Sequence, residues 1–155
     1  MFQRTVLLVA GLVAISPAAA AESFATQVWL NPGMYSHHFR RDQDYREDNY
    51  GLGVEVLIAP QHGFLAGSYI NSNRERSRYA GYEWRPLQWQ PAGINVSGGL
   101  VLVMIDGYSN THNGNWFPAV FPSLSAECGI FGASLNFIPN RNGSALALQL
   151  KLRVW

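Results

Sequence analysis

The chain of 155 residues is the length of one domain, carries a formal net charge of +1, and contains 14% charged and 13% aromatic residues. A nearly neutral chain lacks the clustered basic excess of nucleic-acid-binding proteins, so no nucleic-acid partner is expected. The single cysteine, Cys128, excludes an intramolecular disulfide, and no His-x-x-x-His or similar spacing points to a metal, so neither a metal nor another cofactor is expected.

Residues 1–21 are predicted to be a secretory signal peptide. Arg4 gives a positive start, residues 6–15 form an apolar run, and residues 19–21 are alanines that fit a cleavage site. The apolar run is too short to span a bilayer, which needs about 20 apolar residues. We therefore expect an exported chain whose residues 22–155 form a single domain.

Short alternating runs separated by Gly, Pro and Asn follow the signal peptide and predict an all-β domain. Eight strands are predicted, at residues 24–30, 50–59, 63–70, 77–87, 94–108, 117–127, 130–138 and 144–154. In the last of them, Leu148 and Leu150 share one face, and Lys151 and Arg153 share the other. Eight is the smallest strand number usual for outer-membrane barrels, so we predict an eight-stranded antiparallel up-and-down β-barrel of the outer-membrane type.

Alternation alone also fits a soluble fold whose apolar face is turned inward. Three features favour the membrane: an aromatic residue, Trp155, directly after the last predicted strand, further aromatic residues near predicted strand ends, and residues 98–105, which are apolar on both faces. The sequence therefore predicts a monomeric barrel in the outer membrane of a Gram-negative bacterium.

The predicted connections differ in length and polarity. Short turns are expected at residues 59–63, 91–93 and 140–143, and long polar connections at 38–49, 71–76 and 108–115. Because long loops of such barrels face the exterior, we expect His37, His38, Asn71 and Ser72 to lie at one outer rim.

A serine within reach of a histidine can be deprotonated as it attacks an acyl carbonyl, or the histidine can activate an acceptor hydroxyl directly. Both are acyl-transfer chemistry, whereas the alternative is that Asn71 and Ser72 simply open a turn. Arg74, Arg76 and Arg78 share strand parity with Ser72, and their guanidinium groups suit phosphate. These arginines could equally be solvated loop charges that pair with nearby carboxylates.

Two stretches, "NSNRERSRYAGYEWRPL" and "NWFPAVFPSLSAECGIFGASLNFIP", resemble the outer-membrane lipid A palmitoyltransferases, the PagP family. Members of this family are eight-stranded barrels that move a palmitoyl chain from a phospholipid onto lipid A. The similarity covers most of residues 22–155.

The resemblance assigns roles to individual residues. Ser72 matches the catalytic serine of the family, Asn71 falls where the family has an aspartate, and Glu83 falls where the family has a glycine that lines the buried acyl pocket. The functional histidine corresponds to one of the pair His37 and His38: counting from Tyr35 selects His38, and counting from Pro32 selects His37. Because neighbouring strand residues face opposite sides, at most one of them can face the site, and we favour His38.

The resemblance implies an acyltransferase whose partners are phospholipid and lipid A, the membrane anchor of lipopolysaccharide. His38 would act as general base, Ser72 as nucleophile or hydrogen-bonding partner, and Asn71 as the group that orients them. Two alternatives remain open: a non-enzymatic structural or adhesive outer-membrane barrel, and a soluble periplasmic lipid-binding β-barrel.

Overall fold

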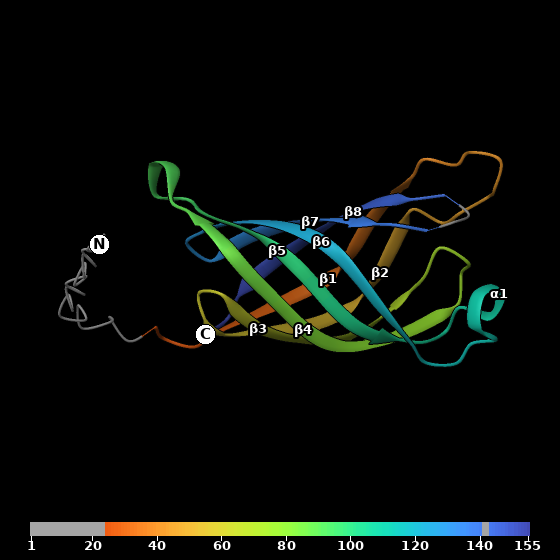
Figure 1. Cartoon of the computed structure of the whole chain (residues 1–155), viewed down its shortest axis with the longest axis horizontal. Coiled ribbons are helices and arrows are strands. Elements are labelled where there is room, and N and C mark those ends of the chain that lie inside the picture. The colour runs from red at the N-terminus through yellow and green to blue at the C-terminus, as the bar shows by residue number, and fades with distance from the viewer. Residues whose placement is uncertain (1–23, 141–142) are drawn as a thin grey trace, which may run out of the picture.

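The computed structural model describes residues 24–140 and 143–155. Eight antiparallel strands form one closed barrel, in which each strand pairs with its neighbours in sequence and β1 pairs with β8 (Figure 1). The strands are β1 (Gln27–His38), β2 (Asp48–Ala59), β3 (His62–Ile70), β4 (Arg76–Trp89), β5 (Asn95–Ile105), β6 (Phe117–Cys128), β7 (Phe131–Ile138) and β8 (Ala145–Arg153). The predicted fold class is confirmed. The predicted signal peptide lies outside the described residues.

The barrel carries apolar side chains on its outer wall and polar side chains inside. In β8, Leu148, Leu150 and Leu152 are exposed, whereas Lys151 between them is only 3% exposed. Outer-membrane barrels have this arrangement, and a soluble lipid-binding barrel turns its apolar face inward instead. The barrel is therefore of the outer-membrane type, and the soluble alternative does not fit its polar interior.

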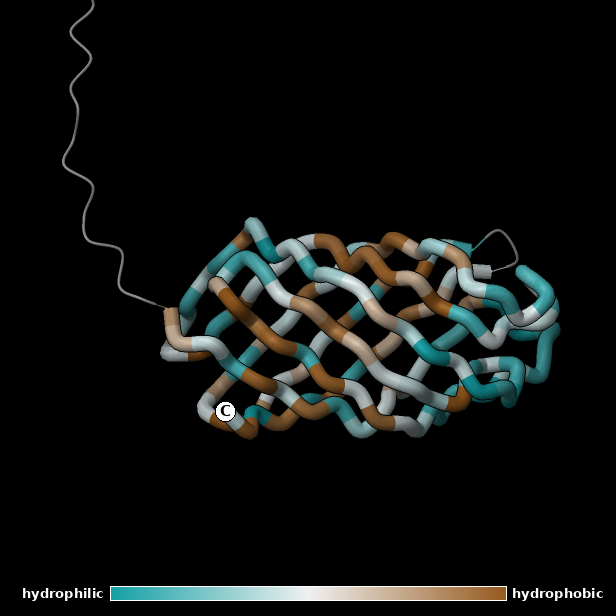
Figure 2. Tube along the Cα trace, turned by 90° about the horizontal axis from the view of Figure 1, so that it is seen from below, coloured by the Kyte–Doolittle hydropathy of each residue, from teal (hydrophilic) through white to brown (hydrophobic). Residues whose placement is uncertain are grey.

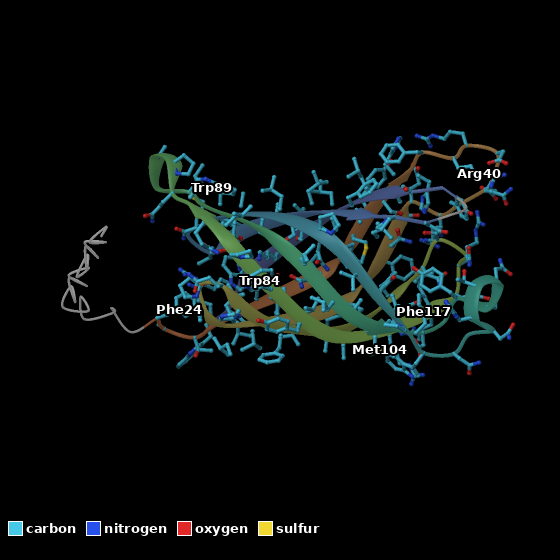
Figure 3. All side chains as sticks on the ribbon, in the orientation of Figure 1. Phe24, Arg40, Trp84, Trp89, Met104 and Phe117 are labelled. Atoms are coloured by element: carbon cyan, nitrogen blue, oxygen red, sulfur yellow. The ribbon has the colours of Figure 1, made fainter. Side chains whose placement is uncertain are left out.

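The polarity of the residues also changes along the axis of the barrel. Apolar segments run along the strands, and polar segments gather at the end that carries the long loops (Figure 2). Trp89 lies toward the opposite end, whereas Arg40 and Phe117 lie toward the long loops (Figure 3). Among the described residues, no helix is long and apolar enough to cross a membrane.

Strand β1 is longer than the predicted strand at residues 24–30. Pro32 and Gly33 look like a turn in the sequence, but they form an irregularity at which the pairing of β1 shifts against both neighbouring strands. Gly33 adopts a φ of 118°, which glycine tolerates without steric cost. The strand therefore continues past them to His38.

The two ends of the barrel differ in their connections. One end carries the C-terminus, the turns after β2 and β6, and the 3-10 turn η1 (Pro91–Gly93). The other end carries the long loops, among them the one with the short helix α1 (Ser109–His112). The connection after β7 was expected among the short turns, but strict alternation of strand direction places it with the long loops, where Ser144 O accepts from Phe39 N at 3.0 Å.

The wall between β6 and β7 is incomplete at the long-loop end. β6 pairs with β7 only from Ser123 to Cys128, whereas residues 117–122 pair with β5 alone. Pro118 and Pro122 lie in this part of β6 and have no amide hydrogen, so fewer backbone donors are left unpaired there.

A cluster of five charged side chains fills the interior nearer the short-turn end. Lys151 Nζ lies 2.8 Å from Glu55 Oε1 and 2.7 Å from Glu127 Oε1. Arg85 Nη2 lies 2.9 Å from Glu127 Oε1, and Arg85 Nη1 lies 3.7 Å from Glu83 Oε1. This ion cluster joins four strands across the barrel through charge-assisted hydrogen bonds.

Replacement of Lys151 by methionine should destabilise the barrel by roughly 3–5 kcal/mol, because Glu55 would lose its closest buried cation and Glu127 would keep only Arg85. The measurement is urea unfolding of the refolded barrel in detergent. Arg76→Met, at the exposed rim, is the matched control and should change stability by no more than about 0.5 kcal/mol. Equal stability of the two variants would contradict the role given to Lys151.

Candidate functional site

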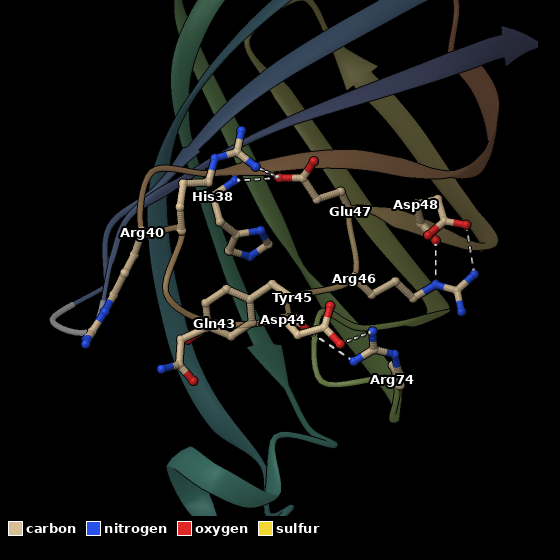
Figure 4. Close-up of a pocket in the computed structure, with 10 residues that line it drawn as sticks. His38, Arg40, Gln43, Asp44, Tyr45, Arg46, Glu47, Asp48 and Arg74 are labelled. Carbon is tan, nitrogen blue, oxygen red and sulfur yellow. Dashed lines mark hydrogen bonds and ion pairs between the residues drawn. The ribbon is translucent and has the colours of Figure 1, made fainter.

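A hollow of about 530 Å³ lies at the long-loop end of the barrel (Figure 4). Its walls come from the end of β1, the loop between β1 and β2, and the turn between β3 and β4. The residues that line it are His38, Arg40, Arg41, Gln43, Asp44, Tyr45, Arg46, Glu47, Asp48 and Arg74.

The structure brings Ser72 and His38 together beside this hollow. Ser72 Oγ lies 3.0 Å from His38 Nε2, although the two residues are 34 positions apart in the sequence. His38 is the last residue of β1 and is 9% exposed, whereas Ser72 lies in the turn that follows β3. His37 contacts the guanidinium group of Arg41 instead, at 2.9 Å. Of the two histidines, His38 is the one that faces the predicted serine.

The ring of His38 is held by a loop residue and is shielded from water. It stacks on the ring of Tyr45, with 4.5 Å between the centroids. Burial lowers the pKa of His38, which lies at the rim beyond the apolar wall, so the ring is neutral at pH 7. If Nδ1 carries the hydrogen, Nε2 accepts the hydrogen bond of Ser72, which is the arrangement that activates a hydroxyl.

The third member expected of such a site, an orienting carboxylate, is not in contact with the ring. Nδ1 of His38 is buried and has no hydrogen-bond partner in the described part of the chain. The carboxylate of Glu47 accepts instead from the backbone amide of His38 at 3.3 Å and from the Tyr35 hydroxyl at 2.9 Å. The Tyr35 hydrogen bond is the main reason that the pKa of Glu47 is lowered. Glu47 therefore positions the backbone of His38.

Asn71 is fully buried, and all of its amide groups are used. Nδ2 donates to Ser77 Oγ at 3.0 Å and to the carbonyl of Gly107 at 2.8 Å. Oδ1 accepts from two backbone amides of its own turn, at 2.9 and 3.1 Å. Asn71 thus shapes the turn that presents Ser72 and ties this turn to the neighbouring loop.

The three predicted phosphate-binding arginines lie in two different places. Arg74 reaches across the hollow to Asp44 at 2.9 Å, whereas Arg76 and Arg78 are exposed on the outer wall of β4. The direction that they were expected to share with Ser72 does not occur, because residues 71–75 form a turn in which Arg74 has a φ of 66°. The alternation of side-chain direction along a strand is not maintained through such a turn.

Of the two outer arginines, Arg78 makes the stronger contacts with its neighbours. It donates to Asp106 through Nε at 2.8 Å and lies over the ring of Trp116, 5.4 Å from its centroid. Arg76 contacts only the hydroxyl of Ser68, at 3.5 Å, among the described hydrogen bonds and ion pairs. Arg76 is therefore the better placed of the two to receive an external phosphate.

Glu83 lies in the ion cluster and not at the rim. It pairs across the sheet with Gly63, near the short-turn end, and is 5% exposed. The structure therefore separates this predicted acyl-pocket residue from Ser72 and His38.

Sequence reasoning missed the roles of Tyr45 and Glu47 beside His38. It did allow nearby carboxylates as partners of the arginines, and the ion pair of Arg74 with Asp44 confirms this. Tyr45, Glu47 and Asp44 all lie in the charged loop between β1 and β2, which has no periodicity from which a contact could be predicted. Within the described ranges, no group of three or more His, Cys, Asp or Glu side chains could hold a metal ion.

Comparison with known proteins leaves the family open. No family model matches the chain. No curated protein matches it either. Among solved structures, the chain is similar to the crystal structure of the N-terminal β-barrel domain of Pseudomonas aeruginosa OprF, with 10% identity and a TM-score of 0.45 over 83% of this chain and 96% of that one.

Replacement of Asn71 by aspartate should destabilise the protein by about 1–3 kcal/mol, because a carboxylate cannot donate to the buried carbonyl of Gly107. The measurement is the free energy of unfolding in urea, combined with limited trypsin cleavage after Arg74. Asn73→Asp makes the same chemical change in the same turn and should have a much smaller effect. If the aspartate at position 71 is tolerated as well as the one at 73, the assigned hydrogen bonds are wrong.

Proposed function

We propose that this barrel spans the outer membrane and transfers an acyl chain from a phospholipid to lipid A, as the PagP family does. The observation that supports the proposal most is the hydrogen bond between Ser72 and His38 beside the hollow at the barrel mouth. The apolar outer wall agrees with a membrane position, in which the long loops meet lipid head groups.

The chemistry needs one proton acceptor and one hydroxyl. His38 takes the proton of the attacking hydroxyl, which belongs either to Ser72 or to the sugar acceptor held beside it. The new ester bond forms between that hydroxyl and the acyl carbonyl, the ester bond to glycerol breaks, and the proton passes from His38 to the glycerol oxygen. When Ser72 is the nucleophile, a second step of the same kind moves the acyl group onto lipid A.

The two groups of arginines suit two phosphate-bearing lipids. Arg74 is available inside the hollow once an anion competes with Asp44, and Arg76 and Arg78 meet lipids that lie outside the barrel. The unpaired edge of β6 lies at the same end of the barrel, where a head group could enter from the side. These positions support a donor and an acceptor that arrive from different directions.

Lipid A from cells that express the wild-type protein should gain the mass of one acyl chain relative to cells with an empty vector. His38→Ala should lower this acylation by at least about 100-fold, because removal of a general base usually costs this much. Ser72→Ala should have an effect of similar size when Ser72 is the nucleophile, and a smaller one when the acceptor hydroxyl attacks directly. His37→Ala is the matched control and should stay close to wild type. The measurement is mass spectrometry of extracted lipid A, after the variants are shown to be folded in the outer membrane.

The rate of acyl transfer should fall on the acid side of neutral pH. Burial lowers the pKa of His38 below the ordinary 6.5, so the neutral base is present at pH 7 and is protonated only at lower pH. The test is the initial rate of acyl transfer in detergent, measured between pH 4.5 and 8 at intervals of about half a pH unit. A midpoint well above the ordinary value would show that His38 is not the base.

A non-enzymatic barrel is the second candidate, and two observations favour it. Nδ1 of His38 lacks an orienting carboxylate among the described residues, and Asn71 is engaged in shaping its turn. In that case the mass of lipid A would be the same with wild type, Ser72→Ala and empty vector. The rim would then serve to bind lipid head groups without chemistry.

A further inference from the structure

We infer that the barrel interior is closed to acyl chains, so that the chain of a lipid bound at Ser72 and His38 lies outside the barrel, along its outer wall in the bilayer. The position of the lipid head rests on the proposed function, but the closure of the interior does not. Two layers of side chains carry this inference, one in each half of the barrel.

The first layer is the ion cluster. Its members Glu55, Glu83, Glu127, Arg85 and Lys151 are each 5% exposed or less. The wall makes room for them with glycines. A methyl group at Gly63 would lie 2.7 Å from Glu83 Oε1, and a methyl group at Gly132 would lie 2.9 Å from the Cγ atom of Lys151. At these two points of the wall the cluster leaves no room for one further carbon atom unless a side chain of the cluster moves.

The second layer lies nearer to the rim and is built from tyrosines. The hydroxyl of Tyr79 is seated against two wall glycines, Gly53 and Gly67, where an added methyl group would collide with it. The hydroxyls of Tyr69 and Tyr108 lie 2.9 Å apart. The space between Tyr79 and the neighbouring wall has no room even for a water molecule. An alkyl chain that entered from the rim would have to displace this layer before it reached the ion cluster.

Displacement of either layer is unfavourable, and a better place for the chain is close by. Inside, an alkyl chain would separate buried charges from their partners without offering them hydrogen bonds. Outside, it meets the exposed apolar side chains of the wall, such as Leu52, Phe64 and Leu102, and the surrounding lipid. The chain therefore stays outside, and no residue of the interior can select its length.

The five tryptophans provide reporters for both sides of the wall. Trp29 is 1% exposed and lies inside, where Lys151 Nζ is 5.0 Å from its ring. Trp84, Trp89, Trp116 and Trp155 are all exposed. The experiment uses two single-tryptophan variants, one that keeps Trp29 and one that keeps Trp84, with phenylalanine at the other four positions. Each is reconstituted into vesicles of phosphatidylcholine brominated near the chain ends, and into vesicles of the same lipid without bromine.

Bromine quenches tryptophan on contact, so the fluorescence ratio between the two kinds of vesicle reports access. We expect strong quenching of Trp84 and a much smaller loss for Trp29. Quenching of Trp29 equal to or greater than that of Trp84 would overturn the inference. Because the replaced residues of the Trp29 variant face outward, phenylalanine there should preserve the fold, which the mobility shift between heated and unheated samples on a gel checks.

A second measurement addresses chain selection. In mixed micelles, phosphatidylcholines that carry acyl chains of different lengths should donate to lipid A at similar rates. A sharp preference for one length would show that the protein encloses the chain and would contradict the inference. Absence of acyl transfer to lipid A would count against the proposed function, and the quenching experiment would still decide whether the interior is closed.

Discussion

The hydrocarbon core of a bilayer offers no water to the backbone, and this constraint shapes the barrel. Each amide and carbonyl group must find its partner within the protein, which a closed sheet achieves. Eight strands close into a barrel whose interior is just wide enough for side chains. The apolar residues must then face outward, and the interior must be filled by polar groups that satisfy one another. The ion cluster around Lys151 follows from that requirement.

The candidate site depends on the same barrel, but it is formed by the end of β1 and by the loops that connect the strands at the rim. β1 carries His38 to the rim, and the turn after β3 brings Ser72 to within 3.0 Å of it. The Tyr45 ring stacks on the imidazole of His38, and the other supports act on the backbone. Glu47 fixes the backbone of His38, and Asn71 fixes the turn of Ser72. A rigid wall and two polar braces thus position a pair that comes from separate segments of the chain.

The barrel was predictable because alternation is a local property that each strand carries in its own sequence. The run of leucines from Leu146 to Leu152 already identifies an outer face, and the count of eight strands follows from the turn residues. The position of the connection after β7 was predicted wrongly, because its short length was given more weight than the strict alternation of strand direction. The extent of β1 was also missed, since Pro32 and Gly33 have the composition of a turn.

Contacts within the interior and the loops were beyond prediction for a different reason. Alternation tells which residues of a strand face inward, but it does not tell at what height they meet. Glu55 and Lys151 are 96 positions apart, and only the register of the strands brings them together. The loop between β1 and β2 has no period at all, so neither the stacking of Tyr45 on His38 nor the position of Glu47 could be derived from its charges.

The irregularity at Pro32 and Gly33 has a consequence for the candidate site at the rim. Side chains of a strand alternate with a period of two, so a shift of one residue exchanges the inner and outer faces. Asn31 faces inward before the irregularity, and Met34, Ser36 and His38 face inward after it, whereas an unbroken alternation would have turned His37 toward the mouth. The irregularity at Gly33 thus determines that His38, and not its neighbour His37, faces Ser72.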